Sequence, residues 1–200
     1  MNPSSVYTPC FPLSIFLLPG EQTLLHLFEP RYKQLLHDVL EGDKTFVIPF
    51  VLDGKVSDLG CQLKVTKVLR TYTEGESDVM VECTRIVRML KLKNKLPERM
   101  YPAGIIRPLT LRVDEPLSDV LLESFKEFEL KRGLNSEEYE YESNTDFYSL
   151  ARALNLSSED KYKLVKLPLR RKELFLLNQI KYLDLLQVQE ESVFNNFYLN

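Results

Sequence analysis

Histidine and cysteine, the side chains used most often as zinc ligands and in nucleophilic catalysis, are scarce in this chain. The sequence contains two histidines, His26 and His37, and three cysteines, Cys10, Cys61 and Cys83. A zinc site needs several such ligands together, and a catalytic histidine needs a nucleophile and an orienting group. None of these five residues lies at ligand spacing from another or from a carboxylate cluster. We therefore expect a packed His26, a solvated His37, and no metal or cofactor.

The cysteines are odd in number, widely spaced and free of any paired-cysteine motif, which argues against a disulfide scaffold and for a reduced cytoplasmic protein. Polar and apolar residues alternate from Cys61 to Thr66, which predicts an inward Cys61 on a strand, and the same alternation predicts an inward Cys83. A reactive thiol prefers an electropositive, partly exposed site. Arg85 lies close to Cys83 and leaves reactivity open, but the alternation favours core packing.

The chain Phe28-Glu29-Pro30-Arg31-Tyr32 joins an expected buried strand to an expected helix. Apolar residues at positions 24, 25, 27 and 28 precede it, and apolar residues at helical spacing follow it. Pro30 suits the first helical position, and Gly42 can close the helix in a left-handed cap. Glu29 and Arg31 could bind a ligand, but we favour a structural role. In that role Glu29 caps the helix, and Arg31 pairs with a nearby carboxylate or carbonyl.

Two kinds of element follow one another along the chain. The patterns predict strands in residues 7–18, 23–28, 44–51, 61–68, 79–83, 86–92 and 101–109, with one helix in residues 30–40. They predict a hairpin turn at Asp53-Gly54 and a bulge at Lys67-Val68. Helical patterns occupy residues 117–128, 147–154, 157–165 and 170–187, with a polar loop in residues 132–144 and a loose tail after residue 190. We expect an α+β protein with a mostly antiparallel barrel in residues 1–112 and a helical domain in residues 113–200.

The overall composition is that of a globular protein. Of the 200 residues, 44% are hydrophobic and 28% are charged, and the net charge is −3. This charge provides no general attraction to nucleic acid or to an anionic membrane. The apolar run near Cys10 lacks the features of a signal peptide, and no run reaches the roughly 18 apolar residues of a membrane helix.

One segment is nevertheless basic. Between Cys61 and Arg107, ten Lys and Arg residues stand against five acids. A possible basic binding face would consist of Lys64, Arg70, Arg85, Arg88, Lys91 and Lys93. These charges alternate with apolar residues, as on any solvated sheet, and no run of aromatic residues offers a stacking platform. A solvated face is therefore the preferred interpretation, and an RNA site is the alternative.

Several short motifs occur in one order and resemble a known family. They are Phe11-Pro12-Leu13, Pro19-Gly20, the apolar run into Phe28-Glu29-Pro30-Arg31-Tyr32, Tyr101-Pro102-Ala103, and the helical Ala151, Leu154, Leu156 and Lys161. Over residues 9–186 the chain resembles the substrate-binding domain of the Lon protease family. Cys83 is a departure, because the family usually has glycine there. The resemblance implies a PUA-like barrel followed by helices, in which the amino-terminal motif is structural.

The resemblance also implies a function without catalysis. The only Gly-Lys pair, Gly54-Lys55, is followed by Val56 and is not a phosphate-binding loop, and the chain has no room for a Ser–Lys peptidase domain. We expect a module that binds unfolded or exposed apolar polypeptide, with a separate protease or chaperone as a further partner. An RNA-binding PUA-like module is the second hypothesis, and a hydrolase is the hypothesis with least support.

Overall fold

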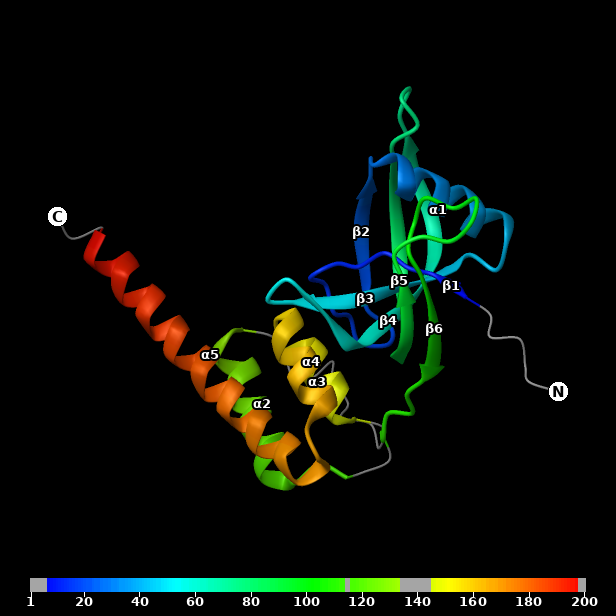
Figure 1. Cartoon of the computed structure of the whole chain (residues 1–200). Helices are drawn as coiled ribbons and strands as arrows, with labels where there is room; N and C mark the ends of the chain where they lie inside the picture. The colour runs from blue at the N-terminus through cyan, green and yellow to red at the C-terminus, as the bar shows by residue number, and fades with distance from the viewer. Residues whose placement is uncertain (1–6, 114–115, 134–144, 198–200) are drawn as a thin grey trace. The chain divides into compact units, whose positions relative to one another are not determined.

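The computed structural model describes residues 7–113, 116–133 and 145–197, with side chains as far as residue 189. Six strands and five helices occupy the described residues (Figure 1). In chain order they are β1 (Thr8–Pro9), β2 (Gln22–Leu27), α1 (Pro30–Glu41), β3 (Thr45–Leu52), β4 (Lys55–Thr71), β5 (Ser77–Lys93), β6 (Ala103–Pro108), α2 (Asp119–Lys131), α3 (Phe147–Ala153), α4 (Ser158–Lys166) and α5 (Leu169–Phe197). This β-rich half followed by an α-helical half confirms the predicted fold class.

The chain divides into two compact units. The first contains the residues up to Leu111 together with Ser157–Tyr162, and the second contains Arg112–Leu156 and the residues from Lys163 onward. A domain boundary between residues 112 and 113 stays a prediction. The inclusion of Ser157–Tyr162 in the first unit was not expected from the sequence.

All strand pairs in the first unit are antiparallel, and the strands follow the order β1-β6-β5-β4-β3, with β2 paired to β5. The long strand β5 therefore has three partners, β2, β4 and β6 (Figure 1). Residues just after β1 continue along β3, where the N–H of Phe11 donates to the C=O of Val47 at 2.8 Å. The amino-terminal segment thus connects the two end strands of the sheet and curls it toward a barrel.

Local sequence explains the long β3–β4–β5 meander. Asp53 and Gly54 both have positive φ, +50° and +72°, as the two-residue turn of a twisted hairpin requires. Cys61, Leu63 and Val65 are buried and alternate with more exposed residues, as predicted. The register between β4 and β5 shifts between Val65 and Lys67 and again between Val68 and Arg70, so irregularities flank the predicted position Lys67-Val68 on both sides.

Helix α1 begins at Pro30 and buries Tyr32, Leu35, Leu36 and Val39, which lie on one face of the helix. Its predicted ending was wrong. Gly42 has a φ of −101°, and the left-handed residue is Lys44, with a φ of +62°. The N–H of Lys44 donates to the C=O of Val39 at 3.0 Å, so the turn closes two residues later than the glycine suggested.

Other predicted boundaries also need correction. Residues 7–18 contain only the two-residue strand β1, and residues 79–92 lie in the single strand β5 rather than in two strands. Helix α5 continues to Phe197, where the sequence predicted a loose tail after residue 190. Most of the predicted polar loop, residues 134–144, lies outside the described residues.

The start of α4 belongs to the first unit through specific contacts. The N–H of Phe16 donates to the Ser158 hydroxyl at 3.0 Å, and the Tyr162 ring packs against Phe16 and Phe50. Lys161 and Glu21 form an ion pair at 2.7 Å, with side-chain exposures of only 8% and 14%. These contacts attach the first turns of α4 to the sheet.

The second unit is helical. Helix α2 is capped by the Ser118 hydroxyl, which accepts the N–H of Leu121, and it buries Leu121, Phe125 and Phe128. Lys131 at its end pairs with Asp184 of α5 at 2.7 Å. Within the described residues, no helix is both long enough and apolar enough to cross a bilayer.

Candidate functional site

The outward side of β2 exposes large apolar side chains. Leu25 and Leu27 are buried, but Leu24 is 53% exposed and Phe28, just after the strand, is 55% exposed. The sequence prediction of a fully buried strand was therefore wrong for half of its apolar residues. Gln22 and His26 lie on the same face of the strand as Leu24, and these two polar residues were the signal in the sequence that this face is exposed.

His26 lies between these two apolar residues and is exposed, which corrects the predicted packed histidine. Its Nδ1 is 2.6 Å from Oδ1 of Asp78, and its Nε2 is 3.6 Å from Oε2 of Glu76. The ring stacks against Phe28 and meets the Tyr72 ring edge-on, each at 5.8 Å between centroids. We call Leu24, His26, Phe28 and Tyr72 the β2 patch.

Asp78 fixes the β2 patch from the neighbouring strand. Besides its contact with His26, it accepts a hydrogen bond from the Tyr72 hydroxyl at 2.7 Å. Hydrogen bonds from His26 and then from Tyr72 hold the pKa of the Asp78 carboxyl below its ordinary value. The carboxylate therefore stays ionised and keeps both rings in place.

The thiols lie in the interior. Cys61 and Cys83 both donate to the C=O of Leu17, at 3.2 and 3.3 Å, and both are buried as predicted. The hydrogen bond with Cys61 and burial raise the pKa of the Cys83 thiol, and burial raises that of Cys10 to about 12. The Cys10 and Cys83 thiols are therefore held protonated, and a buried protonated thiol is a poor nucleophile or metal ligand. Among the described residues, no cluster of three His, Cys, Asp or Glu side chains forms a metal site.

The amino-terminal motif forms the joint between β2 and α1. The ring of Phe11 packs on Tyr32 at 3.8 Å between centroids, and Cζ of Arg31 lies over the Tyr32 ring at 4.6 Å from its centroid. Arg31 pairs with Glu29 at 2.8 Å. The Glu29 side chain makes no capping hydrogen bond, which corrects its predicted capping role, although its backbone occupies the capping position.

The remaining motif residues lie in the segment before β2. Pro12 and Leu13 are partly exposed, and the C=O of Leu13 accepts the N–H of Val51 at 2.9 Å. Pro19 leads into Gly20, whose φ of +86° favours glycine, and the Gly20 N–H donates to the C=O of Cys83 at 2.8 Å. A structural role for this motif remains a prediction.

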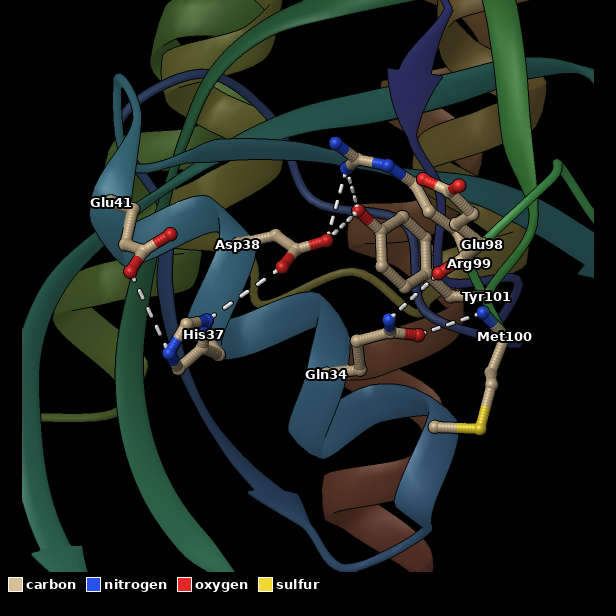
Figure 2. A network of polar contacts seen from close by, with 8 residues as sticks. All are labelled: Gln34, His37, Asp38, Glu41, Glu98, Arg99, Met100 and Tyr101. Carbon is tan, nitrogen blue, oxygen red and sulfur yellow. Dashed lines mark hydrogen bonds and ion pairs between the residues drawn. The ribbon is translucent and has the colours of Figure 1, made fainter.

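A second polar network connects α1 to the segment before β6 (Figure 2). Asp38 accepts a hydrogen bond from the Tyr101 hydroxyl at 2.5 Å and lies 3.0 Å from Arg99, which also contacts the Tyr101 hydroxyl. His37 is 70% exposed, as predicted, and lies 3.7 Å from Asp38 and 3.6 Å from Glu41. Burial and the Asp38 hydrogen bond raise the pKa of Tyr101 to about 12.

The side-chain amide of Gln34 forms two hydrogen bonds with the backbone of the same segment. Its Nε2 donates to the C=O of Glu98 at 3.1 Å, and its Oε1 accepts the N–H of Met100 at 2.7 Å (Figure 2). Glu98 has a φ of +64° and Met100 is 49% exposed. The network fixes the shape of this loop and keeps an apolar side chain at the surface.

The six predicted basic residues are all exposed on β4 and β5, and acidic residues lie opposite or pair with three of them. Lys64 and Arg70 lie on β4, opposite Glu82 and Asp78 in the register. The others lie on β5 and are Arg85, Arg88, Lys91 and Lys93. Arg88 pairs with Asp58 at 2.8 Å, and Lys93 lies over the Tyr7 ring. A basic binding face stays a prediction for these six residues.

The curled antiparallel sheet followed by helices is the fold of Lon protease amino-terminal domains. The crystal structure of a Lon N-terminal domain protein from Xanthomonas campestris matches with a TM-score of 0.61 at 21% identity, over 81% of this chain and 90% of that chain. The N-terminal domain of the Mycobacterium avium complex Lon protease matches with a TM-score of 0.63 at 14% identity, over 88% of this chain and 98% of that chain. At these low identities, the TM-scores show similarity of fold.

The family follows from the sequence match. The model of the ATP-dependent protease La (LON) substrate-binding domain matches residues 7–174, so this chain belongs to that family. No curated protein matches the chain. The predicted resemblance is confirmed, and the matching domain is a substrate-binding one rather than a catalytic one.

Proposed function

We propose that this chain is a non-catalytic module that binds unfolded or exposed apolar polypeptide through the β2 patch. The observation that carries the proposal is the exposure of Leu24 and Phe28 on either side of the exposed His26, while Leu25 and Leu27 on the other face of β2 are buried. Exposed apolar side chains held in place by a polar network are typical of a protein-binding surface. Membership of a substrate-binding family supports the same function.

The proposal has further parts. The bound polypeptide would be a substrate for a separate protease or chaperone, and the protein would act in the cytoplasm. Nucleic acid and membranes are not expected partners, because the net charge is −3 and acids accompany the basic residues of β4 and β5.

A binding titration tests the main proposal. The probe is a fluorescent protein substrate kept unfolded by reduction and carbamidomethylation. We expect the double variant Leu24→Ser/Phe28→Ser to bind the probe about tenfold more weakly, because burial of two half-exposed apolar side chains contributes roughly 1–3 kcal/mol.

The control carries the same chemical change elsewhere. Leu185 and Val188 of α5 are 63% and 64% exposed, so Leu185→Ser/Val188→Ser removes a comparable apolar surface. We expect this variant to keep wild-type affinity. Equal loss in both variants, or no binding by the wild type, would contradict the proposal.

A further inference from the structure

Strand β2 has an open edge. It pairs only with β5 among the described strands, from Gln22 opposite Glu82 to Leu27 opposite Ser77, without a shift of register. Figure 1 shows no strand along the side of β2 that faces away from β5. At the two ends of the sheet path, β1 pairs with the start of β6 and the residues that follow β1 lie along β3.

The hydrogen-bond pattern shows which residues present their backbone at this edge. The N–H of Cys83 donates to the C=O of Glu21 at 2.8 Å, and these two residues are opposite in the register that β2 continues. In an antiparallel pair the bonded positions alternate. Thr23, Leu25 and Leu27 therefore bond to β5, and the N–H and C=O groups of Gln22, Leu24 and His26 point outward.

This edge lacks the usual protection against pairing. Natural edge strands carry lysine, proline or a bulge, or are covered by another segment. The β2 sequence Gln-Thr-Leu-Leu-His-Leu has neither lysine nor proline, and its register with β5 has no bulge from Gln22 to Leu27; the two residues that both bond to Cys83, Gly20 and Glu21, lie before the strand. By contrast, β3 is covered, because Phe11 and Leu13 donate to the C=O groups of Val47 and Pro49.

The edge and its side chains define one kind of occupant. Alternating N–H and C=O groups at strand spacing match the backbone of an extended polypeptide. A residue opposite Leu24 would contact its exposed side chain and would therefore be apolar. Residues opposite Gln22 and His26 would lie near Glu82 at one end and near Glu76 and Asp78 at the other. These carboxylates favour Lys or Arg at both flanking positions.

We propose that β2 receives its polypeptide as an added antiparallel strand, with an apolar residue opposite Leu24 and a basic residue two positions away on each side. The inference rests on the proposed function and specifies the binding mode and the class of segment bound. A second copy of this chain fits less well, because its own Glu82 and Asp78 would add negative charge to an acidic face.

Backbone-modified peptides test this mode. The probe is acetyl-Thr-Lys-Val-Leu-Val-Lys-Thr-amide, whose Lys, Leu and Lys would lie opposite Gln22, Leu24 and His26. In an antiparallel pair the N–H of the central Leu bonds to β2, and those of the two Val residues point away. We expect N-methylation of this Leu to weaken binding to the full chain about tenfold, and N-methylation of both Val residues to change it less than about threefold.

Charge and amide exchange give two further readouts. Replacing both Lys of the probe by Glu should weaken binding about tenfold. In the free protein the amide protons of Gln22, Leu24 and His26 should exchange fast and those of Thr23, Leu25 and Leu27 slowly. Saturating peptide should protect the first set.

The outcomes separate this inference from the proposed function. If the unfolded probe protein binds but N-methylation of Leu and of Val act equally, strand addition is overturned and the proposed function stands. If neither the unfolded protein nor the peptide binds, the proposed function is overturned as well. Concentration-dependent dimerisation that protects the same three amides without peptide would assign the edge to a second copy and overturn the inference.

Discussion

Tyr101 illustrates how one buried hydroxyl organises a surface loop. Its ring is fully buried, and its hydroxyl donates to Asp38 on α1 while Arg99 contacts both groups. The neutral hydroxyl is required for this arrangement, because an ionised phenolate would face the Asp38 carboxylate. The raised pKa of Tyr101, about 12, reflects that repulsion together with burial.

We therefore expect stability to fall as the pH rises from about 10 to about 12. In this range tyrosine ionises in the unfolded chain while Tyr101 stays protonated in the folded chain, so the rising pH favours unfolding. Tyr101→Phe should lower the free energy of unfolding at pH 7 by about 1 kcal/mol through loss of the hydrogen bond. It should also make the alkaline decline shallower, as measured by urea denaturation at several pH values.

Tyr182→Phe is the matched control, because Tyr182 is 56% exposed. We expect this variant to retain both the wild-type stability and the wild-type alkaline decline. An unchanged pH profile in Tyr101→Phe would contradict the role given to the Asp38–Tyr101 contact.

For single residues, the sequence predicted burial better than exposure. The period-two pattern correctly assigned Cys61 and Cys83 to the interior, since that pattern follows from the geometry of one strand. The prediction failed for Leu24, His26 and Phe28, because the apolar run of residues 24–28 was given more weight than the outward parity of the polar Gln22 and His26.

Among the elements, β5 and α4 hold distant parts of the sequence together. The sequence suggested two strands for residues 79–92, because Thr84 and Arg85 interrupt the apolar pattern. The structure continues one strand through both exposed residues, since β4 pairs with it on either side of them. Helix α4 was predicted at its observed start, but its attachment to the sheet depends on contacts more than one hundred residues away in sequence.

We expect the Glu21–Lys161 ion pair, which joins α4 to the residue before β2, to be the strongest polar contact between elements of the first unit. Both groups are nearly buried, so removal of one partner leaves a buried charge without compensation. We expect Lys161→Met and Glu21→Gln each to lower the free energy of unfolding by about 3 kcal/mol. The double variant should lose less than the sum of the two, as measured in a double-mutant cycle of chemical denaturation.

The Lys131–Asp184 pair is the matched comparison. Its side chains are 56% and 26% exposed, so water reaches them more readily than Lys161 and Glu21, although Oδ1 of Asp184 is buried without a hydrogen-bond partner. We expect Lys131→Met to have a clearly smaller effect on stability than Lys161→Met. Additive effects at Glu21 and Lys161 would indicate that the two charges are not coupled in solution.

For the whole molecule, the charge distribution separates the two binding hypotheses. The net charge is −3, and Lys64 and Arg70 of β4 lie opposite Glu82 and Asp78 of β5. Binding of single-stranded RNA depends on several unpaired cations along a path for the phosphates. Here Arg88 and Arg70 already have neighbours of opposite charge.

We expect a single-stranded RNA of about 20 nucleotides to bind the wild type and an Arg85→Glu/Lys91→Glu variant equally weakly, in fluorescence anisotropy at low salt. Polypeptide binding by the two proteins should also be equal, because both residues lie away from β2 in the sheet register. Tight RNA binding that the variant loses would instead support the RNA-binding hypothesis and would confirm the basic face.

The membership of Ser157–Tyr162 in the first unit has a consequence for biosynthesis. A ribosome makes the chain from its amino terminus, so the sheet residues up to Pro108 are complete before any residue of α4 exists. The Lys161 charge and the Tyr162 ring reach the sheet only after the whole of Arg112–Leu156 has been synthesised. The nascent sheet therefore passes through a stage in which Glu21 has no cation partner and Phe16 and Phe50 lack the Tyr162 ring.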